Sequence, residues 1–176
     1  MFKAVFVLLY VFVCTSATGQ MSKIDFPMKN GKVFYEKAYK LSPALQKEEL
    51  FKRALKWFKE DFLNTQKIKL SADKTTGKIT GMGIYKIITA DNGNYYLTRF
   101  KIDIQVNDNG YIFTATAFYE KPIETGISNE YSKIEYRWWD YRQGKPWSAE
   151  DETLFKGIIS DEAALMASLE EQLHNK

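Results

Sequence analysis

The stretch of this sequence with the densest set of side chains that could bind a ligand runs from residue 136 to residue 147. It holds three of the four tryptophans, two tyrosines and two arginines. Aromatic faces and guanidinium planes stack on sugars, on aromatic side chains and on one another. The candidate ligand-binding residues are therefore Tyr136, Arg137, Trp138, Trp139, Tyr141, Arg142 and Trp147. The alternative is structural: the alternation of Ile134, Tyr136 and Trp138 fits an extra strand whose rings cover an open face or edge of a sheet.

Side chains that could perform acid-base catalysis are few. Two carboxylates at the right separation can hydrolyse a glycosidic bond. The candidates are Asp103, Glu120, Glu135 and Asp140, and nothing in their spacing brings two of them together. The single histidine, His174, stands two residues from the C-terminus, where chains commonly fray, so it is a poor general base. The sequence names no catalytic residue and favours a protein that is not an enzyme.

Metal and cofactor sites lack the residues that they require. One cysteine and one histidine cannot form a zinc cluster or a disulfide framework. Gly81-Met82-Gly83 lacks the third glycine and the following helix of a dinucleotide-binding loop. We expect no cofactor and no metal, and we interpret the two glycines as a groove in a strand face that admits a bulky ring such as Trp57.

The charge balance bears on nucleic acid as a partner. Lys plus Arg is 25 and Asp plus Glu is 22, so the formal net charge of the 176 residues is only +3. Proteins that neutralise nucleic-acid phosphates carry a much larger basic excess. We therefore expect no nucleic-acid partner.

The first nineteen residues have the pattern of a signal peptide. Lys3 precedes an apolar run from Ala4 to Val13. That run is too short for a membrane span, which takes roughly 20 apolar residues. The small residues Ala17 and Gly19 occupy the positions that signal peptidase requires before Gln20. We expect residues 1–19 to be removed. The mature chain is then expected to have no transmembrane segment and to be periplasmic or secreted.

Cys14 offers an alternative fate for this leader. It could be the lipidated residue of a lipoprotein signal, which would anchor the protein to a membrane. Such a site needs a small residue before the cysteine, and Val13 stands there. Cleavage before Gln20 is thus the favoured prediction, and lipid anchoring at Cys14 is the lesser alternative.

Periodicity predicts the elements that must position these residues. Residues 20–32 show no apolar period and are expected to be a flexible lead-in to a single α+β domain over 33–176. Within it we predict a strand over 33–41, a helix after Ser42-Pro43, strands over 68–72, 79–88, 96–106 and 111–121, an irregular aromatic segment over 122–147, and a helix over 148–173 with a break near 157–160.

This order of strand, helix, four strands and helix defines a fold class. Successive strands joined by hairpin turns form an antiparallel sheet. Two helices that each have one apolar face then pack on one side of that sheet. The prediction is a two-layer α+β domain.

Two segments carry a resemblance to a known family. Ala54-Leu55-Lys56-Trp57-Phe58 in the predicted first helix and Gly77 to Gly83 in a predicted strand resemble domain of unknown function 4468. The likeness covers about residues 33–121. It implies an exported bacterial protein with a fold like that of the TATA-box-binding protein. It supplies no activity, substrate or site residue, and fold by itself does not imply DNA binding.

These observations favour one function over its main alternative. We expect an exported, non-enzymatic binding or scaffolding domain of the bacterial cell envelope, with an envelope protein or a glycan as the candidate partner. The alternative is an envelope hydrolase that uses a pair of carboxylates. The exposure of the tryptophans and the grouping of the carboxylates would separate the two.

Overall fold

An antiparallel sheet forms the centre of the protein. The computed structural model describes residues 24–41, 45–62, 70–124, 126, 130–143 and 149–174. The strands follow the order β3-β7-β6-β5-β4, and β8 pairs with the outer side of β7. Their bounds are β3 Tyr35–Lys40, β4 Ser71–Asp73, β5 Lys78–Ile88, β6 Tyr95–Asn107, β7 Gly110–Ile123 and β8 Ser132–Lys133. Two further short strands, β1 (Met28–Lys29) and β2 (Lys32–Val33), form a separate hairpin.

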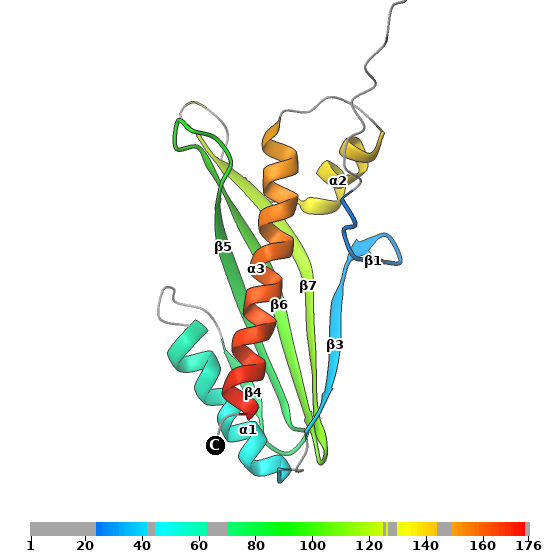
Figure 1. The fold of residues 1–176 in the computed structure, drawn as a ribbon, viewed down its shortest axis with the longest axis vertical. Helices are drawn as coiled ribbons and strands as arrows, with labels where there is room; N and C mark the ends of the chain where they lie inside the picture. The colour runs from blue at the N-terminus through cyan, green and yellow to red at the C-terminus, as the bar shows by residue number, and fades with distance from the viewer. Residues whose placement is uncertain are drawn as a thin grey trace, which may run out of the picture.

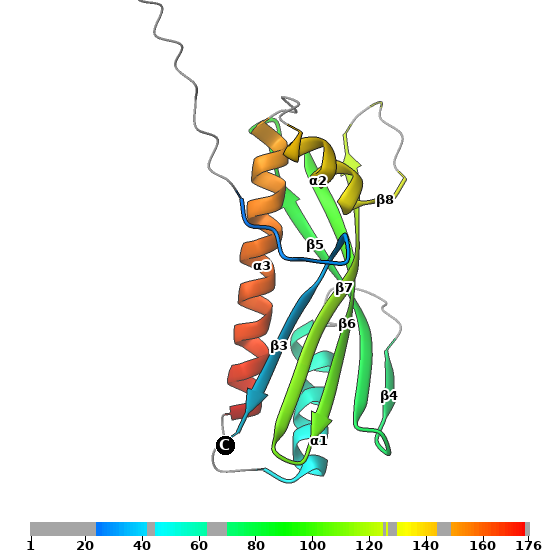
Figure 2. The ribbon, with the colours of Figure 1, turned by 90° about the vertical axis from the view of Figure 1, so that its right-hand side faces the viewer.

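Two long helices cover one face of the sheet. Helix α1 (Lys47–Trp57) continues into a π-helical turn over Phe58–Phe62, and α3 (Ala149–His174) runs along the length of the sheet beside it (Figures 1 and 2). The third helix, α2 (Ile134–Arg142), lies across one end of the sheet. Within the described residues the opposite face carries no helix, and we call it the open face. The predicted α+β architecture with two helices on one face is confirmed.

The central strand β6 shows why these residues form a sheet. Its even-numbered side chains, from Tyr96 to Val106, are buried beneath the helices, whereas the odd-numbered ones lie on the open face. Cross-strand partners keep this division: Ile104 lies opposite both Ile79 of β5 and Phe113 of β7. Alternation with a period of two places one apolar face in the core and leaves a polar face outside.

A β-bulge interrupts the pairing of β6 with β7. Lys101 pairs with Thr116, but Arg99 pairs with Tyr119, so β7 holds one extra residue between them. Ala117 has a φ of 55° there, in the left-handed region that alanine rarely adopts. Beyond the bulge Phe118 points into the core and stacks on Phe100, with ring centroids 5.1 Å apart.

The groove beside the strand glycines is filled by a different ring from the one that we expected. Phe58, not Trp57, lies against Gly81, and the ring of Phe100 lies against Gly83. Trp57 instead faces α3, where its Nε1 donates a hydrogen bond of 3.0 Å to Ser168 Oγ. The helix turns by about 100° per residue, so neighbours in sequence meet different partners.

Three further expectations differ from the structure. Residues 24–32 are not a loose lead-in, because Ile24 and Phe26 are buried and the β1–β2 hairpin follows them. The segment after residue 122 is not irregular throughout, because it contains α2. Helix α3 runs without a break from Ala149 to His174 and buries Glu162 rather than ending before it.

The described residues provide no helix of the kind that crosses a membrane. None of their helices has both the length and the apolar character that crossing a bilayer requires.

Candidate functional site

The aromatic segment folds as a helix, and the side chains that it buries recur at helical spacing. Ile134, Trp138 and Tyr141 are four and three residues apart, and all three are buried on the same side of α2. Glu135 in the first turn and Arg142 in the last suit the ends of the helix dipole. The extra strand considered from the alternation of Ile134, Tyr136 and Trp138 is therefore wrong.

Trp138 belongs to the core. Its ring lies 5.1 Å from those of both Phe26 and Phe155 and 5.6 Å from that of Tyr141, measured between centroids. Phe26 comes from the segment before β1, and Phe155 comes from α3. Trp138 and Tyr141 thus fasten α2 to the rest of the protein.

The other face of α2 presents its rings to solvent. Tyr136 is 65% exposed and Trp139 is 62% exposed. Arg142 is also exposed. Trp147 lies outside the described residues. Of the seven candidate binding residues, Tyr136, Trp139 and Arg142 are the ones that the structure leaves accessible.

Arg137 ties three elements together through two acidic side chains. Its Nη1 donates to Asp151 Oδ1 of α3 at 2.7 Å, and its Nε lies 3.4 Å from Glu120 Oε1 of β7. Its guanidinium also covers the ring of Tyr96, with 4.9 Å from Cζ to the centroid. Burial works against the charge of Arg137, but Glu120 and Asp151 outweigh that effect and raise its pKa. Arg137 is thereby an anchor of α2.

The carboxylates proposed for hydrolysis do not form one free pair. Asp103 lies on the open face and pairs with Lys101, whereas Glu135 Oε1 accepts the N–H of Val33 at 3.0 Å. Glu120 and Asp140 do line a shared hollow of about 200 Å³ with Asp151. Glu120 and Asp151 are both bound to Arg137 there. The hollow is smaller than the roughly 300 Å³ of small ligand sites.

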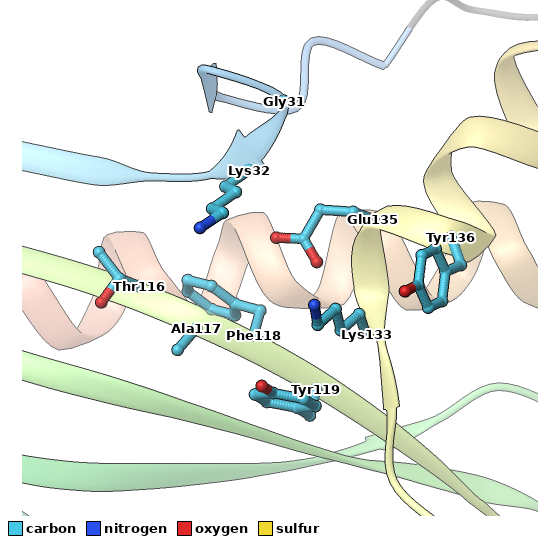
Figure 3. Close-up of a pocket in the computed structure, with 9 residues that line it drawn as sticks. All are labelled: Gly31, Lys32, Thr116, Ala117, Phe118, Tyr119, Lys133, Glu135 and Tyr136. Atoms are coloured by element: carbon cyan, nitrogen blue, oxygen red, sulfur yellow. The ribbon is translucent and has the colours of Figure 1, made fainter.

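A larger hollow lies between α2 and the edge of β7, and we call it the edge hollow. It has a volume of about 500 Å³, and Figure 3 shows its lining. Tyr136 and Glu135 border it from α2, Lys133 from β8, and Lys32 from the β1–β2 hairpin. Its floor is the β7 segment Thr116 to Tyr119. One predicted site residue, Tyr136, therefore does line a ligand-sized space.

The edge hollow exists because β7 is uncovered over part of its outer edge. The pairing of β3 ends at Tyr35 with Ala115, and that of β8 begins at Lys133 with Tyr119. Thr116, Ala117 and Phe118 have no strand partner on this side. The bulge at Ala117 falls within this gap. Bulges at sheet edges commonly end a pairing and redirect side chains.

Charged groups surround this gap. Lys32 reaches in from β2 and Lys133 from β8, with the carboxylate of Glu135 between them (Figure 3). One oxygen of Glu135 is bound to the backbone of Val33. Neither lysine forms an ion pair in the part of the chain that the structure describes. The edge hollow therefore offers two ammonium groups beside the exposed ring of Tyr136.

Sequence reasoning named Tyr136 as a candidate binding residue and Glu135 as a candidate carboxylate, but it missed the other residues of this lining. Lys32 lies in the segment predicted to be a flexible lead-in, and Lys133 stands just before the aromatic cluster. Thr116 to Phe118 looked like an ordinary strand. No sequence signal marked the bulge, since alanine carries no preference for a left-handed conformation.

Metal binding receives no support from the described residues. No group of three or more His, Cys, Asp or Glu side chains among them is arranged to hold an ion.

Comparison with protein families gives a match over the sheet and the first helix. The model for a domain of unknown function with a TBP-like fold, DUF4468, matches residues 24–121. The match begins nine residues before the stretch that the sequence resemblance covered. No curated protein matches the chain significantly.

Two crystal structures resemble the whole fold. A TBP-like protein from Parabacteroides distasonis superposes with a TM-score of 0.72 at 18% identity, covering 85% of this chain and 97% of that one. A DUF4468 family protein from Bacteroides ovatus superposes with a TM-score of 0.70 at 14% identity, covering 86% and 91%. At such identities the likeness concerns the fold alone.

Proposed function

The chain belongs to the DUF4468 family of domains with a TBP-like fold, and from that premise we propose that it is an exported, non-catalytic binding module of the bacterial cell envelope. The edge hollow is its binding site. The single observation that carries this proposal is the gap in the outer edge of β7, where Lys32 and Lys133 converge beside the ring of Tyr136.

The lining indicates what the site binds. Two ammonium groups without ion-pair partners in the described chain favour a ligand with a carboxylate. The unpaired strand edge at Thr116 to Phe118 offers backbone groups to hydroxyls. An aromatic ring such as Tyr136 can stack on a sugar face. The ligand class is an acidic saccharide, in agreement with the glycan partner expected for an exported domain.

Titration with sodium glucuronate tests this assignment, with glucose as the uncharged counterpart. Backbone amides of Thr116, Ala117 and Phe118 should shift in two-dimensional NMR spectra when glucuronate is added, and shift much less with glucose. Lys133→Gln should weaken glucuronate binding about fivefold, the effect of losing roughly 1 kcal/mol from one charge-assisted contact. Tyr136→Ala should weaken both sugars.

Lys40→Gln is the matched control. Lys40 is exposed on β3 and pairs with Gly110, nine residues along β7 from the position that Lys133 opposes. That separation is about 30 Å along a strand. Its loss should leave glucuronate affinity unchanged. Equal affinities for glucuronate in the Lys133 and Lys40 variants would overturn the proposed site.

A further inference from the structure

A second hollow lies on the open face of the sheet, away from α2. It has a volume of about 690 Å³, which is the size of a small-ligand site. Leu70, Met82, Ala117 and Tyr119 give it a largely apolar lining. Arg99 and Lys101 of β6 border it. We call it the open-face hollow.

Arg99 is held at this hollow by two aromatic rings. Its guanidinium Cζ lies 4.3 Å from the ring centroid of Tyr131 and 5.3 Å from that of Tyr119. These contacts fix the plane of the guanidinium without neutralising its charge. Its Nε is buried and has no hydrogen-bond partner in the described structure.

Other cations nearby, unlike Arg99, are paired with carboxylates. Lys101 Nζ lies 2.7 Å from Asp103 Oδ2, and Lys78 Nζ lies 3.7 Å from Asp103 Oδ1. Arg137 is bound to two carboxylates. No carboxylate among the described residues pairs with Arg99. An arginine that is oriented, partly desolvated and unpaired has an incomplete set of hydrogen bonds.

We propose that the open-face hollow binds a small amphipathic carboxylate, with its head group on Arg99 and its apolar body against Met82 and Leu70. A guanidinium matches a carboxylate in a two-point hydrogen bond. The apolar walls disfavour a ligand that is charged throughout. The site is separate from the edge hollow, because the strand β7 lies between the two and only Ala117 and Tyr119 border both.

Three probes separate the contribution of the apolar chain from that of the carboxylate: sodium octanoate, 1-octanol and sodium acetate. Octanoate carries both the apolar chain and the carboxylate, octanol only the chain, and acetate only the charge. Calorimetric titration should give octanoate an affinity at least tenfold above that of either partial probe. The amides of Met82, Arg99 and Tyr119 should shift on octanoate addition, whereas that of Gly110, which lines neither hollow, should not.

Variants of two cations on this face, Arg99 and Lys86, complete the test. Arg99→Gln should reduce octanoate affinity about tenfold, and Arg99→Lys should recover only part of it, because lysine lacks the planar fork. Lys86→Gln, which removes a charge from the same face without touching the hollow, should change the affinity less than twofold. Thermal unfolding of each variant checks that it is folded. Met82→Asp provides a second test: it places a negative charge on the apolar wall and should therefore lower the affinity for octanoate. Equal affinity for octanoate and octanol, equal affinity of the wild type and Arg99→Gln, or no octanoate binding at millimolar concentration would each overturn the proposal.

Discussion

Phe58 lies against Gly81 so closely that a Cβ atom at residue 81 would stand 2.5 Å from ring atom Cε1. Real Cβ atoms do not approach a carbon to that distance. The glycine in β5 and the phenylalanine after α1 therefore fit only as a pair, and their contact sets how closely the first helix can approach the sheet.

Gly81→Ala should destabilise the protein by about 1 to 3 kcal/mol, the range for an overpacked core. Urea unfolding measures the loss. Replacing the ring with the smaller leucine side chain, in the double variant Gly81→Ala with Phe58→Leu, should recover part of the lost stability. The two substitutions should therefore couple. Strictly additive effects would show that Phe58 is not the neighbour that excludes a side chain at residue 81.

Trp138 and Trp139 should behave oppositely although they are adjacent. Trp138→Ala removes a ring packed on Phe26 and Phe155 and should cost about 3 to 5 kcal/mol. Trp139 is 62% exposed, and its replacement by alanine should change the free energy of unfolding by less than about 0.5 kcal/mol. Losses above about 2 kcal/mol in both variants would place both rings in the core.

Stability should fall as pH rises because of Glu162. This residue of α3 is fully buried, with Tyr35 and Tyr85 facing it from the sheet and Asp161 beside it. Burial raises its pKa from 4.5 to about 8. Between these two values the folded protein keeps a proton that the unfolded chain loses. Stability is therefore highest below about pH 4.5 for this group and declines until about pH 8.

Glu162→Gln removes this titration. The wild type should lose on the order of 4 kcal/mol relative to the variant between pH 4.5 and pH 8. Glu171→Gln, an exposed change on the same helix, serves as the control and should follow the wild type. Chemical denaturation at several pH values measures all three. Parallel curves for the wild type and Glu162→Gln would contradict the assignment.

Expression from the natural start should yield a protein that begins at Gln20. The measurement is intact-mass spectrometry of protein recovered from the periplasm or medium. Retention of Met1 would overturn the proposed export, and a lipid on Cys14 would replace it with a membrane-anchored form. Ala17→Arg should block processing, because the peptidase requires a small side chain at that position.

The sheet was predictable because the side chains of each central strand alternate between a buried face and a solvent-facing one. In β6 the alternation from Tyr96 to Val106 follows directly from that geometry. The turn residues between the strands then imposed antiparallel neighbours. Local sequence was sufficient wherever the partner of a residue lay in the next strand.

The segment before β1 and helix α2 were not predictable in the same way. Phe26 is ordered because it packs on Trp138 and Phe155, which lie more than a hundred residues away. The short run from Ile134 to Tyr141 fits a period of two as readily as a helical period, and only the core on one side decides between them. The edge hollow depends on both of these segments and on the bulge at Ala117, so no local pattern could show it.

The separation in sequence between β3 and β7 shapes how the chain folds. Strands β4 to β7 follow one another through hairpins, whereas β3 pairs with residues at least 70 positions further along. Contacts between distant segments form slowly, because a long loop must close before they contribute. The hairpin strands can therefore assemble first and β3 add last. Pulse-labelled hydrogen exchange should protect the amides of β6 before those of β3, and the outer edge of β7 is exposed to other chains until β3 arrives.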